Sequence, residues 1–300
     1  MKNKLKTLQI FVWAIMCAII LFSLSLSIAS LKIRGTKEIY AWYTIDWGAD
    51  YEADFKTVRS MNIDGVFLRS NSHTFLSDSE AFVEAIACAR SFNLSIGIIV
   101  FHPYDMTHQE IWGLPVNGGT FSDIANKTWI EKVYITKLRN LVSLGDSLGV
   151  SYYVFDDMTF DKASNLTNAQ LFIDITEEVT NGRSLMLACY PPENITVFLQ
   201  LRINKWDWYT APENVGDIMR SRAARPRDCS SIGQFLWLNE RTDISLNDLK
   251  RAYRALASFD RLELFELRYG RSDWENGIDN SILEHKSLVE QITEQNKLIK

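Results

Sequence analysis

Short apolar runs alternate with amphipathic segments along most of the chain. Runs rich in β-branched and aromatic residues predict strands, and apolar residues spaced three or four positions apart predict helices between them. The strand runs are mostly apolar throughout, which is typical of parallel strands buried on both faces. The expected strands cover residues 39–46, 64–70, 94–102, 150–156, 183–190, 204–210, 231–239 and 261–268.

Helix start signals occur in the segments between these strands. Ser77 to Glu80 and Thr128 to Glu131 have the spacing of a capping box, and Ser245 to Asp248 is an acidic variant of it. Apolar positions between 282 and 292 indicate a last helix. The signals therefore predict a helix after most of the strands.

This alternation predicts an α/β fold, a (β/α)8 TIM barrel. The eight units span residues 39–296, close to the length of about 250 residues that is typical of such barrels. A doubly wound open sheet is the competing architecture, but no glycine-rich phosphate turn follows the first strand. The long irregular segment 103–127 is expected to form a loop over the barrel mouth.

A different pattern occupies the N-terminus. Residues 8–31 contain no charge, and about 20 apolar residues suffice to cross a bilayer. Lys2, Lys4 and Lys6 precede this run, so the positive-inside rule places the N-terminus in the cytoplasm and the rest of the chain outside. We therefore expect a transmembrane helix that partners with the membrane.

These observations divide the chain into a signal anchor, residues 1–31, and an extracytoplasmic barrel, residues 32–300. The expected location is the cell membrane, with a single pass. Ser27 and Ala29 also fit a signal-peptidase site, so a cleaved leader and a secreted protein are the alternative. Four glycosylation tripeptides fit export and begin at Asn93, Asn126, Asn165 and Asn194.

Composition limits the classes of partner and cofactor. The net charge is −5, and no basic run follows the leader, which argues against a nucleic-acid partner. Beyond the leader the cysteines are Cys88, Cys189 and Cys229, with no C-x-x-C motif and no His/Cys cluster. We therefore expect no metal site, and the sequence indicates no cofactor.

Polar and aromatic residues gather at the expected strand ends. TIM-barrel enzymes place their active sites at the C-terminal ends of the strands, and carboxylates combined with flat rings suit a carbohydrate. A structural interpretation accompanies several candidates, such as helix capping by Asp46, barrel packing of Trp237 or pairing of Arg69 with a neighbouring carboxylate. The candidate substrate contacts are Asp46, Trp42, Arg69, His102, Asp157, Tyr190, Asp207, Tyr209, Trp237 and Glu266.

Two carboxylates are the candidate catalytic pair. Asp156 follows an apolar strand directly and could attack an anomeric carbon, while Glu213, just past the sixth strand, could protonate the leaving group. The structural alternatives are a helix cap for Asp156 and a first-turn helix residue for Glu213. Asp207 is the second candidate for the acid, unless it points outward or lies too deep, and Glu193 is the third.

Several of these segments resemble glycoside hydrolase clan D, the α-galactosidase-like barrels. Leu94-Ser95-Ile96-Gly97-Ile98 resembles the third strand of that clan, and Val154-Phe155-Asp156 resembles the strand that ends in the nucleophilic aspartate. The segment 208–213 falls where the clan has its acid/base, normally an aspartate, and 244–257 resembles the stretch before the last strand. The resemblance implies a retaining hydrolase, although Leu68-Arg69-Ser70 replaces the paired acidic residues that follow the second strand.

The functional expectation is an exported, membrane-tethered glycoside hydrolase that cleaves O-glycosidic bonds by retention. The alternative is a non-catalytic glycan-binding or cell-surface barrel, which needs an aromatic groove but no paired carboxyls. Another barrel enzyme, such as a lyase or an esterase, would need a serine nucleophile elbow or metal-ligand spacing, and the sequence contains neither.

Overall fold

A computed structural model describes most of the predicted barrel. The residues that it describes belong almost entirely to one compact unit, Lys37–Asn296. They are residues 37–45, 50–70, 79–101, 126–156, 158, 165–189, 200–210, 228–237, 260–265, 269–270, 278–279 and 286–297.

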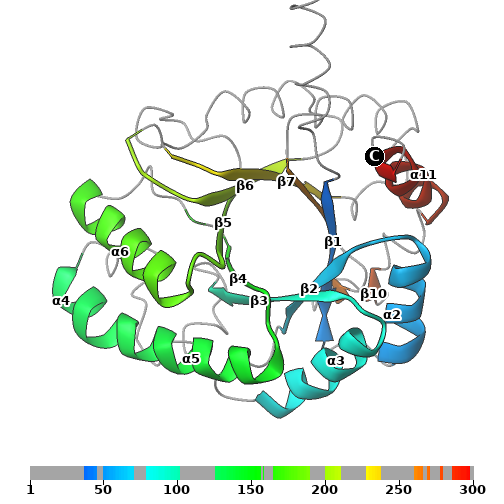
Figure 1. Ribbon diagram of the computed structural model, residues 1–300, viewed down its shortest axis with the longest axis horizontal. Coiled ribbons are helices and arrows are strands. Elements are labelled where there is room, and N and C mark those ends of the chain that lie inside the picture. Colours follow the sequence, from blue (N-terminus) through cyan, green and yellow to red (C-terminus); the bar gives the residue numbers. More distant parts are fainter. Residues whose placement is uncertain are drawn as a thin grey trace, which may run out of the picture. The chain divides into compact units, whose positions relative to one another are not determined.

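Eight parallel strands close into a barrel, as the alternation of apolar runs predicts (Figure 1). Each strand pairs with the next along the chain, and β1 pairs with β8 to complete the ring. The TIM-barrel prediction is therefore confirmed. The strands are β1 (Glu38–Thr44), β2 (Gly65–Arg69), β3 (Ser95–Phe101), β4 (Tyr152–Phe155), β5 (Ser184–Cys189), β6 (Lys205–Thr210), β7 (Ser231–Trp237) and β8 (Arg261–Phe265).

The described helices lie outside the strand ring (Figure 1). Their buried apolar residues form one core with the outward-facing residues of the strands, such as Val66, Ile98 and Leu264. Two short strands, β9 (Tyr269–Gly270) and β10 (Ile278–Asp279), pair antiparallel beyond β8. The helical elements are α2 (Tyr51–Ser60), α3 (Ser79–Ser91), α4 (Lys127–Trp129), the π-helical η4 (Ile130–Tyr134), α5 (Ile135–Leu148), α6 (Leu166–Val179) and α11 (Lys286–Lys297).

The predicted capping box at Thr128 is wrong. The helix begins two residues earlier, because the side chain of Asn126 accepts a hydrogen bond from the backbone N–H of Trp129 at 3.2 Å. Glu131 instead pairs with Lys127 one turn before it, at 3.5 Å. Ser77 and the box at Ser245 lie outside the described residues.

Glycines make room for large side chains inside the barrel. A Cβ at Gly97 would overlap the ring of Phe67, and a Cβ at Gly65 would overlap the ring of Tyr40 and the backbone oxygen of Ser95. These two rings stack with their centroids 4.4 Å apart. The interior is therefore a packed core rather than a channel, as is usual in this fold.

No helix among the described residues is long and apolar enough to span a membrane. The expected spanning segment, residues 8–31, lies outside the part of the chain that the structure describes. Cys88 and Cys229 are not in a disulfide, and the buried Cys229 donates a hydrogen bond to the backbone oxygen of Ser231 at 3.0 Å.

Candidate functional site in the barrel mouth

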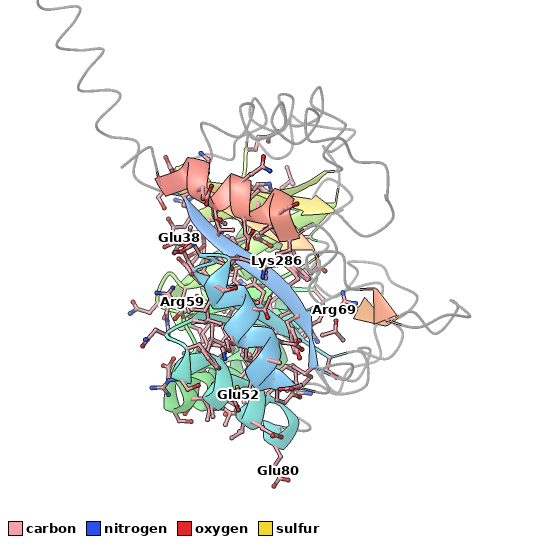
Figure 2. The ribbon with its side chains drawn as sticks, turned by 90° about the vertical axis from the view of Figure 1, so that its right-hand side faces the viewer. Glu38, Glu52, Arg59, Arg69, Glu80 and Lys286 are labelled. Carbon is pink, nitrogen blue, oxygen red and sulfur yellow. The ribbon has the colours of Figure 1, made fainter. Side chains whose placement is uncertain are left out.

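The polar side chains that the structure describes at the barrel mouth come from the C-terminal ends of β1, β2 and β4. Thr44 ends β1 and Arg69 ends β2, and the Nε of Arg69 donates a hydrogen bond to the hydroxyl oxygen of Thr44 at 2.9 Å. Glu38, at the start of β1, and Arg69 lie toward opposite ends of these strands (Figure 2). Arg69 is half-buried, so its guanidinium lies at the rim of the mouth.

Asp156 follows β4 directly and belongs to this rim. Val154 is part of the cluster inside the barrel, whereas Tyr153 and Phe155 pack in the outer core. Because side chains alternate along a strand, Asp156 falls on the inward phase, with only 6% of its surface exposed. Two residues later, the N–H of Met158 donates to the backbone oxygen of Leu187 at 2.8 Å, which ties the segment after Asp156 to β5.

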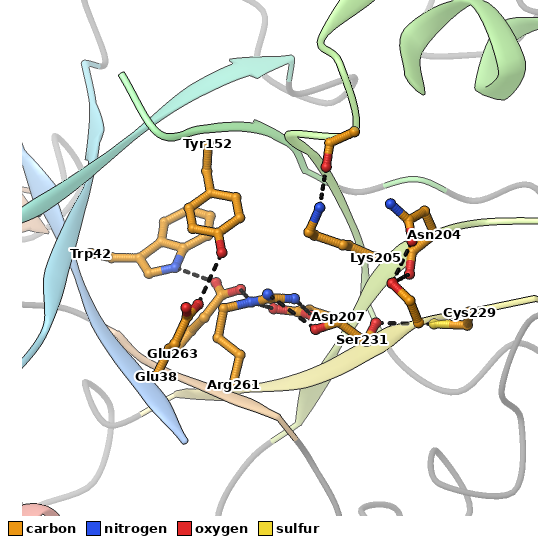
Figure 3. Close-up of polar contacts among 12 residues, drawn as sticks. Glu38, Trp42, Tyr152, Asn204, Lys205, Asp207, Cys229, Ser231, Arg261 and Glu263 are labelled. Carbon is orange, nitrogen blue, oxygen red and sulfur yellow. Dashed lines mark hydrogen bonds and ion pairs between the residues drawn. The ribbon is translucent and has the colours of Figure 1, made fainter. Parts of the chain in front are cut away.

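Trp42 lies one inward position below Thr44 on β1. Its indole N–H donates a hydrogen bond of 2.6 Å to the Oε2 atom of Glu263 (Figure 3). Its ring meets Phe67 edge to face, with the ring centroids 6.3 Å apart. Only 1% of Trp42 is exposed. The indole is therefore a fixed part of the barrel interior beneath the rim.

A buried ion pair lies deeper in the barrel. The Nε and Nη2 atoms of Arg261 donate to the two carboxylate oxygens of Asp207 at 2.8 and 2.5 Å (Figure 3). Both side chains are almost completely buried. Gly233 on the neighbouring strand provides the space, since a Cβ there would overlap the Asp207 carboxylate. This geometry is the two-point pairing in which arginine binds a carboxylate most strongly.

Glu263 adjoins this ion pair. Its pKa is raised well above the ordinary value, first by burial and then by the negative charge of the neighbouring Asp207. The charge of Arg261 and the hydrogen bond from Trp42 oppose that rise.

The N-terminal end of the barrel carries a second polar group. The hydroxyl of Tyr152 donates to Glu38 at 3.0 Å, and the ammonium of Lys205 donates to the backbone oxygen of Gly182. The guanidinium of Arg261 lies 5.7 Å from the centre of the Tyr152 ring. The residues that contribute these side chains each begin a strand, so the contacts lie at the end of the barrel opposite the mouth.

The predicted site residues divide into those that the structure describes and those that it does not. Arg69 and Asp156 lie at the rim and Trp42 lies beneath it, while Asp207 points inward and lies deep, in an ion pair with Arg261. The backbones of Tyr209 and Trp237 lie in β6 and β7, and their side chains are not described. The predicted residues outside the described part are Asp46, His102, Asp157, Tyr190, Glu213 and Glu266.

The sequence predicts Arg69 as a substrate contact, with pairing to a neighbouring carboxylate as the alternative, and its described partner is the hydroxyl of Thr44. Two other residues of this arrangement were missed by sequence reasoning. Arg261 and Glu263 were not singled out, although they alternate with Leu262 and Leu264 along β8. That alternation is the signal that could have placed both charges inside the barrel.

Among the described residues, no group of three or more His, Cys, Asp or Glu side chains could hold a metal ion. One open pocket lies elsewhere, on the outer side of α6, where Gln170 and Asp174 meet Arg202. It is separate from the barrel interior and from Asp156.

Comparison with known proteins supports the fold. The sequence matches no protein-family model and none of the curated proteins. Solved structures of glycoside hydrolases match most of the chain. A GH5_18 protein from Streptomyces cattleya in complex with GlcNAc has a TM-score of 0.63 at 9% identity, covering 88% of this chain and 81% of its own.

Two further structures have the same kind of barrel. A GH113 β-mannanase from Alicyclobacillus acidocaldarius matches with a TM-score of 0.56 at 12% identity, covering 89% of this chain and 98% of its own. The catalytic domain of a chitinase from Pyrococcus furiosus matches with a TM-score of 0.52 at 11% identity, covering 88% and 96%. The expected glycoside-hydrolase-like barrel is thus confirmed as a fold, and identities this low do not choose between clans.

Proposed function

We propose that this protein is a glycoside hydrolase in which Asp156 is the catalytic carboxylate. The observation that carries the proposal is the place of Asp156, which directly follows β4 on the inward phase, at the end of the barrel where enzymes of this fold act. The fold that the chain shares with a mannanase and a chitinase supports a carbohydrate substrate.

The proposed chemistry is retention with two carboxyl groups. Asp156 attacks the anomeric carbon, the glycosidic C–O bond breaks, and the proton of Glu213 passes to the leaving oxygen. Water then displaces Asp156 from the sugar and gives its proton back to Glu213. This role requires the two carboxyls to lie about 5–5.5 Å apart, whereas about 6.5–9.5 Å would assign an inverting reaction.

Asp156→Asn is expected to abolish hydrolysis by the full-length chain, since an amide cannot serve as the nucleophile. Turnover is measured on aryl glycosides, β-mannan and chito-oligosaccharides. The matched control is Asp228→Asn, an exposed residue before β7 whose positive φ of 55° an asparagine also adopts. It is expected to keep full activity and the same unfolding midpoint.

Two outcomes would contradict this assignment. Undiminished hydrolysis by the Asp156→Asn variant would remove Asp156 from the mechanism. A wild-type protein that binds these sugars without ever cleaving them would instead identify a glycan-binding barrel.

We propose further that residues 8–31 anchor the barrel outside the cell, because this uncharged run follows three lysines. The full chain is expected to stay with membranes after an alkaline wash, while protease added to intact cells digests the barrel. A soluble product that begins after Ala29 would identify a cleaved leader. A barrel protected from external protease would contradict export altogether.

A further inference from the structure

Three ionisable side chains meet inside the barrel without balancing one another. Asp207, Arg261 and Glu263 are each at most 1% exposed. With both carboxyls ionised, they would carry two negative charges against one positive charge. Burial of an unbalanced charge is costly, so such a group is paired or neutralised in a folded protein.

The guanidinium of Arg261 is committed to Asp207. Two of its nitrogens bond the two oxygens of Asp207, and Nη1 donates to the hydroxyl of Ser231 at 3.4 Å. The nearest oxygen of Glu263 lies 4.0 Å from Nε, beyond hydrogen-bond distance. Glu263 therefore receives attraction from Arg261 but no hydrogen bond.

The two oxygens of Glu263 have different surroundings. Oε2 accepts the indole N–H of Trp42 at 2.6 Å. Oε1 is buried and accepts no hydrogen bond from any described residue, and the neighbour with which this carboxyl interacts is the carboxylate of Asp207. Two carboxyl groups form a hydrogen bond only when one of them is protonated.

Among the residues that the structure describes, the other charged groups near this cluster do not supply the missing positive charge. Lys205 on β6 and Glu38 on β1 stand at the N-terminal end and have opposite signs. Burial raises the pKa of Tyr40 and of Tyr152, so both phenols are neutral. On β7 the neighbour of Asp207 is Gly233.

We propose that Glu263 is a neutral carboxylic acid in the folded barrel, that it shares its proton with Asp207, and that it is the fixed acceptor that positions Trp42 beneath the mouth. The neutral acid leaves one negative and one positive charge, which cancel. The protonation of Glu263 does not depend on the proposed function. The contribution of a fixed Trp42 to catalysis does rest on the proposed function.

The proton of Glu263 makes stability depend on pH in a defined direction. Burial raises the pKa of Glu263, so the folded protein keeps a proton that the unfolded chain releases above pH of about 4.3. The unfolding constant of the wild type should therefore rise as pH increases, about tenfold per pH unit from this group, until Glu263 itself ionises in the folded state.

The decisive measurement compares urea unfolding of the full chain, wild type and Glu263→Gln, from pH 5 to 8. Glutamine can accept the hydrogen bond of Trp42 and donate one to Asp207, as the neutral acid does, so this variant should fold. Its unfolding constant should lack the tenfold rise per pH unit that Glu263 contributes. Glu178→Gln, the same exchange on the exposed face of α6, should follow the wild type. Identical slopes for wild type and Glu263→Gln would overturn the proposal.

A spectroscopic measurement keeps the proposal falsifiable if Glu263→Gln does not fold. At pH 8 the wild type should retain an infrared carbonyl band of a protonated carboxylic acid, which a fully ionised set of carboxyls would lack. Its absence would show that no buried acid is neutral. Where the variant folds, the band should be lost in Glu263→Gln and retained in Glu178→Gln.

The role of Glu263 toward Trp42 has its own readout. Glu263→Gln should keep the wild-type KM, whereas Glu263→Leu, which has no acceptor for the indole, should raise KM several-fold with a smaller change in kcat. Equal KM values for the two variants would remove the positioning role. If the wild-type protein hydrolysed none of the glycosides, the proposed function would be wrong. The unfolding and infrared results would still decide whether Glu263 is protonated.

Discussion

Replacing Arg261 by methionine is expected to lower the free energy of unfolding by about 3–5 kcal/mol, because it leaves Asp207 buried and without its counter-ion. Both side chains are almost completely buried, and both oxygens of Asp207 depend on the guanidinium. Methionine fills much of the same volume, so the loss reports the stranded charge rather than a cavity. Urea unfolding followed by circular dichroism measures the change.

The chain offers a matched control in Arg202. This residue pairs with Asp174 at 3.4 Å on the surface, where both side chains are more than half exposed. Arg202→Met should cost less than about 1 kcal/mol, as exposed pairs generally do. Asp207→Asn in the Arg261→Met background should recover part of the loss, since it removes the stranded charge. A single variant Arg261→Met as stable as Arg202→Met would refute this account.

Gly97→Ala and Gly65→Ala are each expected to lower the free energy of unfolding by about 1–3 kcal/mol through overpacking of the barrel interior. The two losses should respond differently to a second substitution that shortens the overlapped side chain. The atoms that a Cβ at Gly97 would overlap belong to the ring of Phe67, and the next contact is 3.3 Å away. At Gly65 the overlap includes the backbone oxygen of Ser95. A substitution that shortens the side chain at position 67 can remove the first overlap, whereas no substitution removes the backbone oxygen of Ser95.

A pair of double-mutant cycles, again by urea unfolding, separates these cases. Phe67→Leu should offset the Gly97→Ala loss, with a coupling energy of about 1–2 kcal/mol. Tyr40→Leu should leave most of the Gly65→Ala loss in place. Additive losses in the first cycle would show that the close approach of Phe67 does not set the requirement for glycine at position 97.

The barrel was predictable because its strands depend on local chemistry. Each apolar run had to bury two faces, and the observed strands begin and end within about three residues of the predicted ones. The start of the helix that Asn126 caps was placed wrongly, because serine, threonine and asparagine all cap helices and starts two residues apart fit the same segment. The geometry of the turn before the helix decides which of these residues caps it.

The polar interior was harder to predict, because charges inside a strand usually indicate a solvent-facing side. In β6, Lys205 and Asp207 alternate with the outward-facing Trp206, and in β8, Arg261 and Glu263 alternate with leucines. Asp207 and Arg261 both pair in register with Gly233 of β7, so the two charged patterns meet across that strand, which the sequence of either strand alone does not show. Glu213, the predicted partner of Asp156, lies outside the described residues and stays a prediction.

Closure of the ring by β1 and β8 has a consequence during synthesis. Trp42 and Glu263 are 221 positions apart in the chain, so their contact cannot form until nearly the whole unit has left the ribosome. Until then β1 and the newest strand present open edges that can pair with another nascent chain. A chain with such distant contacts is expected to fold slowly, because its ring closes only after β8 has been synthesised. We expect chaperones to protect the open strand edges until then.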